Sequence, residues 1–99
     1  MELKLNGNIQ RYIWSVIVEK AQDNEDEWSK LILGVRRRTL NITKDNVEGF
    51  KSAFAWFAEM VDDELDEKGF DMTTEEREGN KKELACASKI LDKLWSFEK

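Results

Sequence analysis

The sequence contains no histidine and no proline, and it has a single cysteine, Cys86. Zinc sites of the usual kinds cannot form with no histidine and only one cysteine, and without histidine the commonest general base of enzymes is missing. Ser–His and Cys–His nucleophile pairs are excluded for the same reason. A single cysteine excludes a disulfide within the chain, which fits a reducing compartment. We therefore expect a protein that is not an enzyme and that uses no cofactor.

Long hydrophobic runs and phosphate-binding loops are also missing. No apolar run approaches the length of a membrane span, and the start, Met1-Glu2-Leu3-Lys4, lacks the pattern of a secretory signal. The five glycines form neither G-x-x-x-x-G-K nor G-x-G-x-x-G. We expect a cytoplasmic protein with no membrane partner. The 99 residues are 40% hydrophobic and 37% charged, which predicts one globular domain over residues 1–99.

Residues 64–75 superficially match a calcium-binding loop, since glycine and glutamate stand at its sixth and twelfth positions. However, Lys68 occupies the fifth position, where calcium needs an oxygen ligand. The sequence therefore predicts no metal site.

Residues 1–42 are predicted to form a β-hairpin or meander. Leu3 and Leu5 alternate with charged neighbours, and Asn6-Gly7 is a strong hairpin signal. In the next segment, one face of a strand would carry Tyr12, Trp14, Val16 and Val18. A helix from Ile9 to Ala21 is the alternative, but the density of β-branched and aromatic residues favours a strand.

The segment from Trp28 to Ile42 contains a change of hydrophobic phase, because Leu31, Leu33 and Val35 stand at odd positions whereas Leu40 and Ile42 stand at even ones. Side chains along a strand alternate between the two faces of a sheet, so the apolar set cannot move to the other face unless a residue is inserted or the strand breaks. A bulge or turn between Gly34 and Thr39 is therefore predicted, giving either one bent strand or two short strands. Arg36, Arg37 and Arg38 lie at this irregularity.

Two helices are predicted in the rest of the chain. Thr43 is the expected cap of a helix over residues 43–68, whose apolar residues recur at three- and four-residue spacing. Thr73 and Glu76 form a capping-box pattern for a second helix over residues 73–98, for which a break near 79–80 is an alternative. The expected fold class is α+β, with an N-terminal antiparallel sheet of three or four strands packed against two C-terminal α-helices.

The charge is strongly segregated along the chain. Residues 59–78 contain ten carboxylates against Lys68 and Arg77, whereas residues 28–58 carry an excess of basic side chains. Several of these acids crowd the carboxyl end of the first helix, where the helix dipole disfavours negative charge. A role in stability does not explain this placement, so we interpret it as a partner-binding patch. Its members are Asp62, Asp63, Asp66, Glu67 and Asp71.

Trp56 and Met60 lie opposite the predicted core stripe of the first helix. They form either an outward apolar anchor for a partner or a second packing face against the C-terminal helix. An outward tryptophan is typical of interfaces, and in that case a homodimer is also expected.

The basic residues allow a different interpretation. Arg36, Arg37 and Arg38, with Tyr12, Trp14 and Trp28 on nearby strands, would suit single-stranded nucleic acid, which binds basic grooves lined by aromatic rings. In its order of strands followed by a capped helix, the segment 10–61 resembles the PC4/Whirly type of single-strand DNA-binding domain. The resemblance implies a basic sheet that binds DNA. The net charge of −5 and the acidic helix end depart from that family.

We therefore expect a small, acidic, non-catalytic protein that binds a protein partner and regulates or inhibits it. In size and charge it resembles regulatory proteins of phages and mobile elements, which implies an inhibitor of a host enzyme or defence system. A PC4-like nucleic-acid-binding protein is the alternative, and a structural or assembly subunit is a third possibility.

Overall fold

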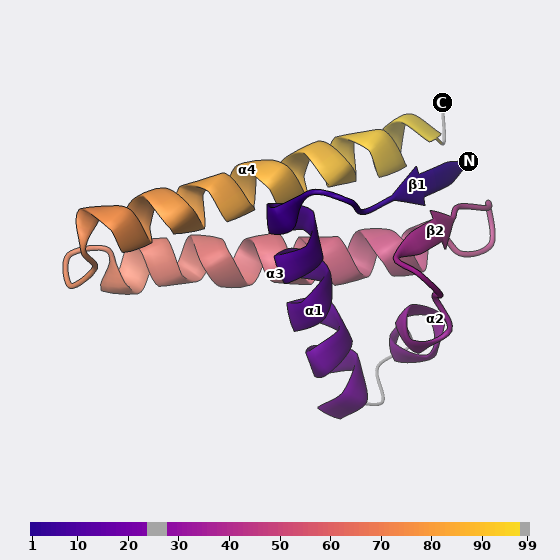
Figure 1. The fold of residues 1–99 in the computed structure, drawn as a ribbon, viewed down its shortest axis with the longest axis horizontal. Coiled ribbons are helices and arrows are strands. Elements are labelled where there is room, and N and C mark those ends of the chain that lie inside the picture. The colour runs from indigo at the N-terminus through magenta and orange to yellow at the C-terminus, as the bar shows by residue number, and fades with distance from the viewer. Residues whose placement is uncertain (24–27, 98–99) are drawn as a thin grey trace.

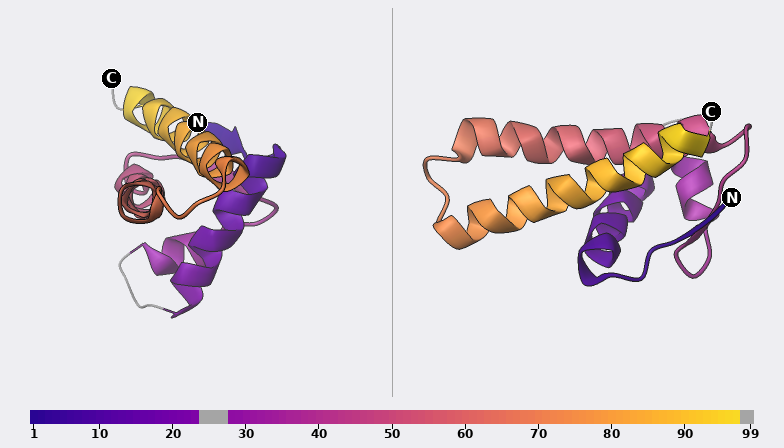
Figure 2. Two further views of the ribbon diagram at one scale, coloured as in Figure 1. Left: turned by 90° about the vertical axis from the view of Figure 1, so that its left-hand side faces the viewer. Right: turned by 90° about the horizontal axis from the view of Figure 1, so that it is seen from above.

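A computed structural model describes residues 1–23 and 28–97 of the chain. The elements follow in the order β1 (Glu2–Lys4), α1 (Asn8–Asp23), α2 (Ser29–Leu33), β2 (Thr39–Asn41), α3 (Val47–Lys68) and α4 (Thr74–Phe97). Helices α3 and α4 form a long antiparallel hairpin, and α1 crosses it near its middle (Figure 1). Both termini and the two strands lie at the end of this hairpin that is opposite its turn (Figures 1 and 2).

The predicted three- or four-stranded sheet is wrong, because the described residues form only a two-stranded antiparallel ribbon. Its register pairs Leu3 with Leu40. The Asn6-Gly7 dipeptide does not turn a hairpin. Instead, the backbone amides of Asn6 and Gly7 both donate to the side-chain oxygen of Gln10, which leads the chain into α1. Strand β1 therefore pairs with β2, which is distant in sequence. Local turn signals do not predict such a pairing.

The segment predicted as the second strand is helix α1, so the alternative over Ile9 to Ala21 is the correct one. Its buried residues Ile13, Ile17 and Ala21 recur every four positions and share one helical face, with Trp14 beside them. Burial of this face against the helical hairpin outweighs the β propensity of the individual residues.

The segment 28–42 is neither one bent strand nor two short strands. Its first part is the short helix α2, in which Ile32 is buried while Leu33 is half exposed. Leu31 and Leu33 belong to this helix and Val35 follows it, so their alternation in sequence does not mark a strand. Only Thr39–Asn41 is a strand, and a turn at Arg37 and Arg38 precedes it.

The predicted core stripe of α3 is buried, and it is the centre of the core together with residues of α4 and α1. The largest buried side chains include Phe50, Phe54, Phe57, Ile13, Ile17, Ile90 and Leu94. Helix α3 begins after a reciprocal pair of hydrogen bonds between Thr43 and Asn46. Helix α4 is capped by Thr73, whose hydroxyl accepts the amide of Glu76 at 3.1 Å, and it runs through 79–80 without a break.

None of the described helices has a window apolar enough and long enough to cross a membrane.

Candidate functional site

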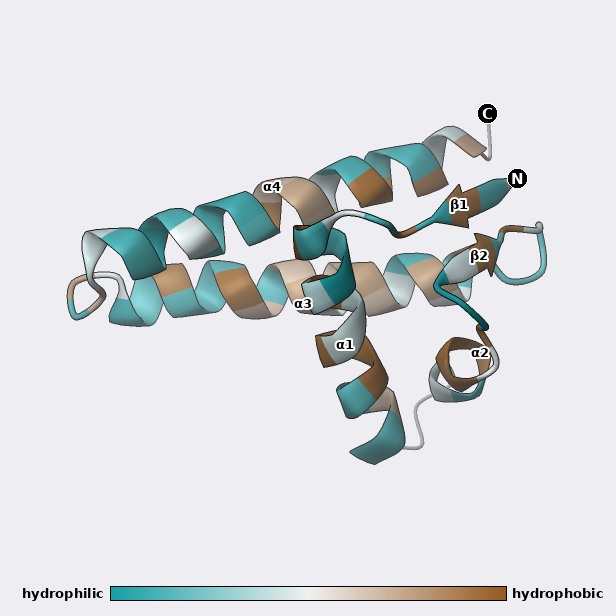
Figure 3. Ribbon diagram, viewed as in Figure 1, coloured by the Kyte–Doolittle hydropathy of each residue, from teal (hydrophilic) through white to brown (hydrophobic). Residues whose placement is uncertain are grey.

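The five acidic residues singled out from the sequence lie together at the free end of the α3–α4 hairpin. Asp62, Asp63, Asp66 and Glu67 belong to the last two turns of α3, Asp71 lies in the turn that follows, and all five are exposed. Hydrophilic residues dominate this end of both helices (Figure 3). Within residues 1–23 and 28–97, none of the five forms an ion pair.

The turn between the two helices presents an aromatic side chain that is not among the residues predicted from the sequence. Phe70 is 98% exposed and stands directly before Asp71. A phenyl ring this open to water makes no use of its apolar surface within the fold. Its sequence signal was weak, since it is one aromatic residue between Gly69 and an acid. We call Phe70 and the five carboxylates the acidic tip.

Three hydrogen bonds support the turn that carries Phe70 and Asp71, two of them to the backbone and one between side chains. The guanidinium of Arg77 donates to the carbonyl oxygen of Gly69, and the amide of Asn80 donates to the sulfur of Met72 at 3.6 Å. The cap made by Thr73 is the third. The turn is thus tied to the first two turns of α4, so Phe70 projects from a supported loop.

Trp56 and Met60 do not join the acidic tip. Trp56 is half-buried with its ring centroid 6.1 Å from that of Trp28, and the ammonium of Lys20 lies 5.4 Å from its centroid. Met60 is half-buried against the core. The sequence predicted that this pair either faces outward or packs against the C-terminal helix. The ring contacts of Trp56 are instead with Trp28, which precedes α2, and with Lys20 of α1.

The three arginines form a tight turn before β2. Arg37 and Arg38 have φ angles of 54° and 53°, and the amide of Thr39 donates to the carbonyl of Arg36 at 3.1 Å. Two successive positive φ angles are the pattern of the type I′ turn. Arg36 and Arg37 are exposed, and Arg38 is half-buried with its carbonyl bonded to the amide of Leu5.

The structure does not gather the predicted aromatic platform around these arginines. Trp14 is only 6% exposed and its ring stacks on Phe54 at 6.1 Å. Trp28 packs on Trp56, and Tyr12 is exposed on α1. On a helix, residues 12 and 14 lie about 200° apart and not on one face. Of the three rings, only Tyr12 is open to a ligand.

Tyr12 belongs instead to a second acidic cluster on the flank of the hairpin. Partial burial, with the nearby charge of Glu64 adding to it, raises the pKa of Glu83. Burial and the carboxylates of Glu83 and Glu64 raise the pKa of Tyr12. A cavity of about 250 Å³ lies here between α1 and α4, and Gly79 forms part of its wall. The cluster was not predicted because it depends on α1 being a helix.

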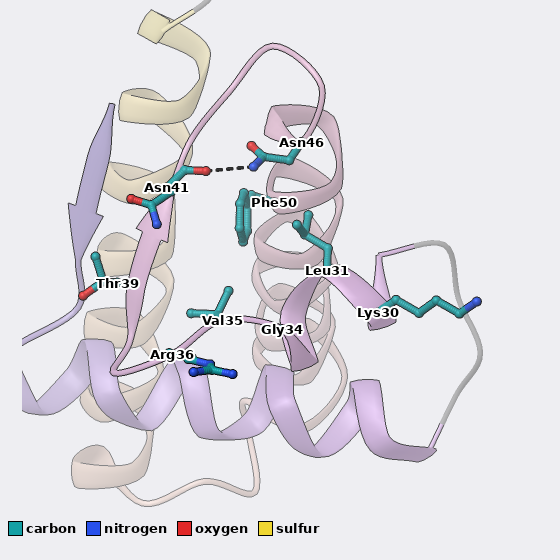
Figure 4. A pocket seen from close by; sticks show the side chains of 9 residues that line it. All are labelled: Lys30, Leu31, Gly34, Val35, Arg36, Thr39, Asn41, Asn46 and Phe50. Carbon is teal, nitrogen blue, oxygen red and sulfur yellow. Dashed lines mark hydrogen bonds between the residues drawn. The ribbon is translucent and has the colours of Figure 1, made fainter.

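A larger cavity, of about 460 Å³, lies between α2, β2 and the start of α3 (Figure 4). Leu31, Val35 and Phe50 supply its apolar lining, and Arg36 lies at its edge. Lys30 also lines it but extends away from the other side chains in this view. The turn of the three arginines therefore borders a hollow surface.

The part of the chain that the structure describes contains no group of three or more His, Cys, Asp or Glu side chains placed to hold a metal ion. Cys86 is a half-buried residue that packs against the core, and its burial raises the pKa of the thiol.

No protein-family model, curated protein or solved structure matches this chain. The resemblance of residues 10–61 to the PC4/Whirly type therefore stays a prediction, as does the likeness to phage regulatory proteins.

Proposed function

We propose that this protein binds a basic protein partner through the acidic tip and thereby regulates or inhibits that partner. The observation that carries the proposal is Phe70, which is 98% exposed at the free end of the hairpin beside Asp71. An exposed aromatic ring next to carboxylates combines the two components of many interfaces, an apolar anchor and a charged surround that guides encounter.

The position of the carboxylates supports this proposal. Asp66 and Glu67 lie in the last turn of α3, where the negative end of the helix dipole faces them. The only basic residue in that turn is Lys68. Stability would favour basic side chains at these positions, so a partner that supplies the missing positive charge accounts for them better.

The shape of the molecule supports it as well. The tip is the part of the hairpin farthest from the strands and the termini, and α1 and α2 do not cover it (Figure 1). A partner can reach it without displacing another element of the fold.

A site-specific crosslinker tests the proposal. A photoreactive phenylalanine analogue replaces Phe70 in cells that encode the protein, and the crosslinked partner is identified by mass spectrometry. The same analogue at Leu33, an exposed residue of α2, is the matched control. We expect a basic protein that is crosslinked from position 70 and not from position 33.

Binding of the purified partner is then measured by calorimetry at two salt concentrations. We expect Phe70→Ala to weaken binding about tenfold or more, as for an anchor residue. Replacement of Asp62, Asp63, Asp66 and Glu67 by their amides should also weaken it and should flatten its salt dependence, because screening acts on exposed charges. Full affinity in both variants would show that the acidic tip is not the binding surface.

Single-stranded nucleic acid remains a second candidate because of one observation. The Arg36–Arg38 turn lies beside β2, at the opposite end of the hairpin from the acids (Figure 1), so repulsion between DNA and the tip is reduced. A fluorescent oligonucleotide titrated at low salt tests this. Micromolar binding that is lost in a variant with Arg36 and Arg37 replaced by glutamine would support it, and absence of binding would exclude it.

A further inference from the structure

The cavity of about 460 Å³ shown in Figure 4 is large enough for a small molecule, since ligand pockets commonly span about 300–1,000 Å³. It is built from four separate parts of the chain: α2, the loop after it, β2 and the start of α3. Its lining combines the apolar side chains of Leu31, Val35 and Phe50 with a few polar groups. That composition is usual for binding sites of small organic molecules.

The charge of the lining has one sign. Among the residues that the structure describes, Arg36 and Lys30 are the charged side chains that line the cavity, and no described carboxylate lines it. Among the described residues Arg36 forms no ion pair. This local positive charge contrasts with the formal net charge of −5 of the whole protein. A guanidinium that borders a cavity and pairs with no described carboxylate favours an anionic ligand, which it binds through charge-assisted hydrogen bonds.

The backbone holds Arg36 at the edge of the cavity at an energetic cost. Arg37 and Arg38 both adopt left-handed φ angles, which are sterically unfavourable for residues that carry a side chain. The Asn-Gly pair that hairpins favour would form the same turn without that cost. Strain of this kind tends to persist at binding sites, and here it fixes the residue that borders the cavity.

The opposite wall is also held in place. The side-chain amide nitrogen of Asn46 donates to the backbone carbonyl of Asn41 at 2.7 Å. The side-chain oxygen of Asn46 accepts a hydrogen bond from the backbone amide of Thr43 at 2.8 Å. The bond between Asn46 and Asn41 joins the end of β2 to the residue before α3 (Figure 4). Within the described part of the chain, the side-chain amide of Asn41 makes no hydrogen bond of its own, so it remains available to a ligand.

We propose that this cavity binds a small anionic molecule with a flat apolar body. The anionic group pairs with Arg36, the amide of Asn41 donates a hydrogen bond, and the apolar body packs on Leu31, Val35 and Phe50. The site is independent of the acidic tip, so each proposal can fail without the other. A carboxylate, sulfonate or phosphate satisfies the same chemistry.

Titrations followed by two-dimensional NMR test the site with naphthalene probes of equal size. The probes are naphthalene-1-sulfonate, 1-naphthoate, 1-naphthyl phosphate and the uncharged 1-naphthalenemethanol. We expect the anions to shift the amides of residues 31–41 and to bind about tenfold or more tightly than the alcohol, as one charge-assisted contact predicts. The relative affinities of the three anions identify the preferred group.

Variants separate the site from nonspecific attraction. Arg36→Gln should weaken anion binding about tenfold, whereas Arg36→Lys should retain part of it. Val35→Trp should fill the cavity and weaken all four probes. Arg37→Asn is the control, because it removes a neighbouring charge that does not line the cavity, and it should change affinity by less than about twofold.

Equal binding of the alcohol and the anions would overturn the proposal, and so would an unchanged affinity in Arg36→Gln. Absence of binding by all three anions at millimolar concentration would overturn it as well. The NMR spectrum of each variant reports whether the fold is intact. If Arg36→Gln does not fold, the comparison of wild type with Val35→Trp and Arg36→Lys decides the result.

Discussion

The ammonium nitrogen of Lys51 lies 3.7 Å from the centroid of the Trp95 ring, so a lysine of α3 that is 4% exposed is covered by a tryptophan of α4. The same nitrogen donates to the carboxylate of Glu48 at 3.3 Å. The indole explains how a lysine is tolerated between the two helices, since an aromatic face attracts a cation while it excludes water.

Replacement of Trp95 should therefore destabilise the hairpin although the ring is 58% exposed. We expect Trp95→Ala to lower the free energy of unfolding by about 1–2 kcal/mol, the value of a desolvated cation–π contact. Trp95→Phe should lose less than half of that. Urea denaturation measures both. Equal losses in the two variants would show that the aromatic face is not what stabilises Lys51.

Replacement of Gly79 by alanine should increase the stability of the protein. It lies inside α4, where glycine costs about 0.5–1 kcal/mol relative to alanine. Nothing lies within 4 Å of a Cβ placed there. Gly79→Ala should therefore stabilise the protein by about that amount in the same denaturation experiment.

Gly49 provides the matched comparison inside α3. A Cβ at this position would lie 2.6 Å from a methyl carbon of Leu31, so the Leu31 side chain, or α2 with it, must shift to accept it. We expect Gly49→Ala to stabilise less than Gly79→Ala or to destabilise, because overpacking offsets the gain in helix propensity. An equal gain at both positions would mean that α2 does not pack closely on α3.

Glu83 should make stability depend on pH in a defined direction. Its pKa in the folded protein is raised, chiefly by burial and then by Glu64, so folding disfavours the charged form. The destabilisation is absent below the ordinary pKa of a glutamate and complete above the raised one. Glu83→Gln should therefore raise the melting temperature more at pH 7 than at pH 4. The control is Glu59→Gln, at an exposed position of α3, and a similar pH dependence in both variants would contradict the prediction.

Glycine at position 37 should relieve the backbone strain of the turn. Arg37 is exposed and has a φ of 54°, and glycine adopts this conformation without a steric penalty. We expect Arg37→Gly to raise the free energy of unfolding by about 0.5–1 kcal/mol, part of the strain being offset by the greater freedom of glycine in the unfolded chain. Arg36→Gly, outside the left-handed positions, should not stabilise. A loss of stability in Arg37→Gly would show that its side chain contributes more than the strain costs.

Features that depend on neighbouring residues were readable from the sequence. The stripe of α3 from Val47 to Val61 repeats with the helical period over several turns, and it is buried. The capping residue Thr73 acts within three positions, and its hydrogen bond to Glu76 is present. Thr43 does not cap its helix as predicted, because α3 begins at Val47 and Thr43 bonds Asn46 in the turn before it. The clustering of the carboxylates up to residue 71 followed from their positions in the sequence and from the prediction that a helix ends at residue 68.

The alternation of apolar residues in α1 and α2 misled the prediction, because short segments of either type carry similar patterns. Whether residues 8–23 become a helix or a strand was decided by the surface that receives them. Ile13, Ile17 and Ala21 are buried as one face against the helical hairpin, and a strand would have placed them on one side of a sheet that the chain does not build.

The sequence by itself determined the segregation of charge, the two long helices and the absence of histidine chemistry, since each follows from residue types and local spacing. Only the tertiary structure decided that Phe70 stands free beside the carboxylates, that Trp14 is buried, and that Arg36 borders a cavity. These outcomes depend on contacts between segments far apart in the chain, such as β1 with β2. Local periodicity carries no information about such contacts because the free energy that selects them comes from burial of the whole core.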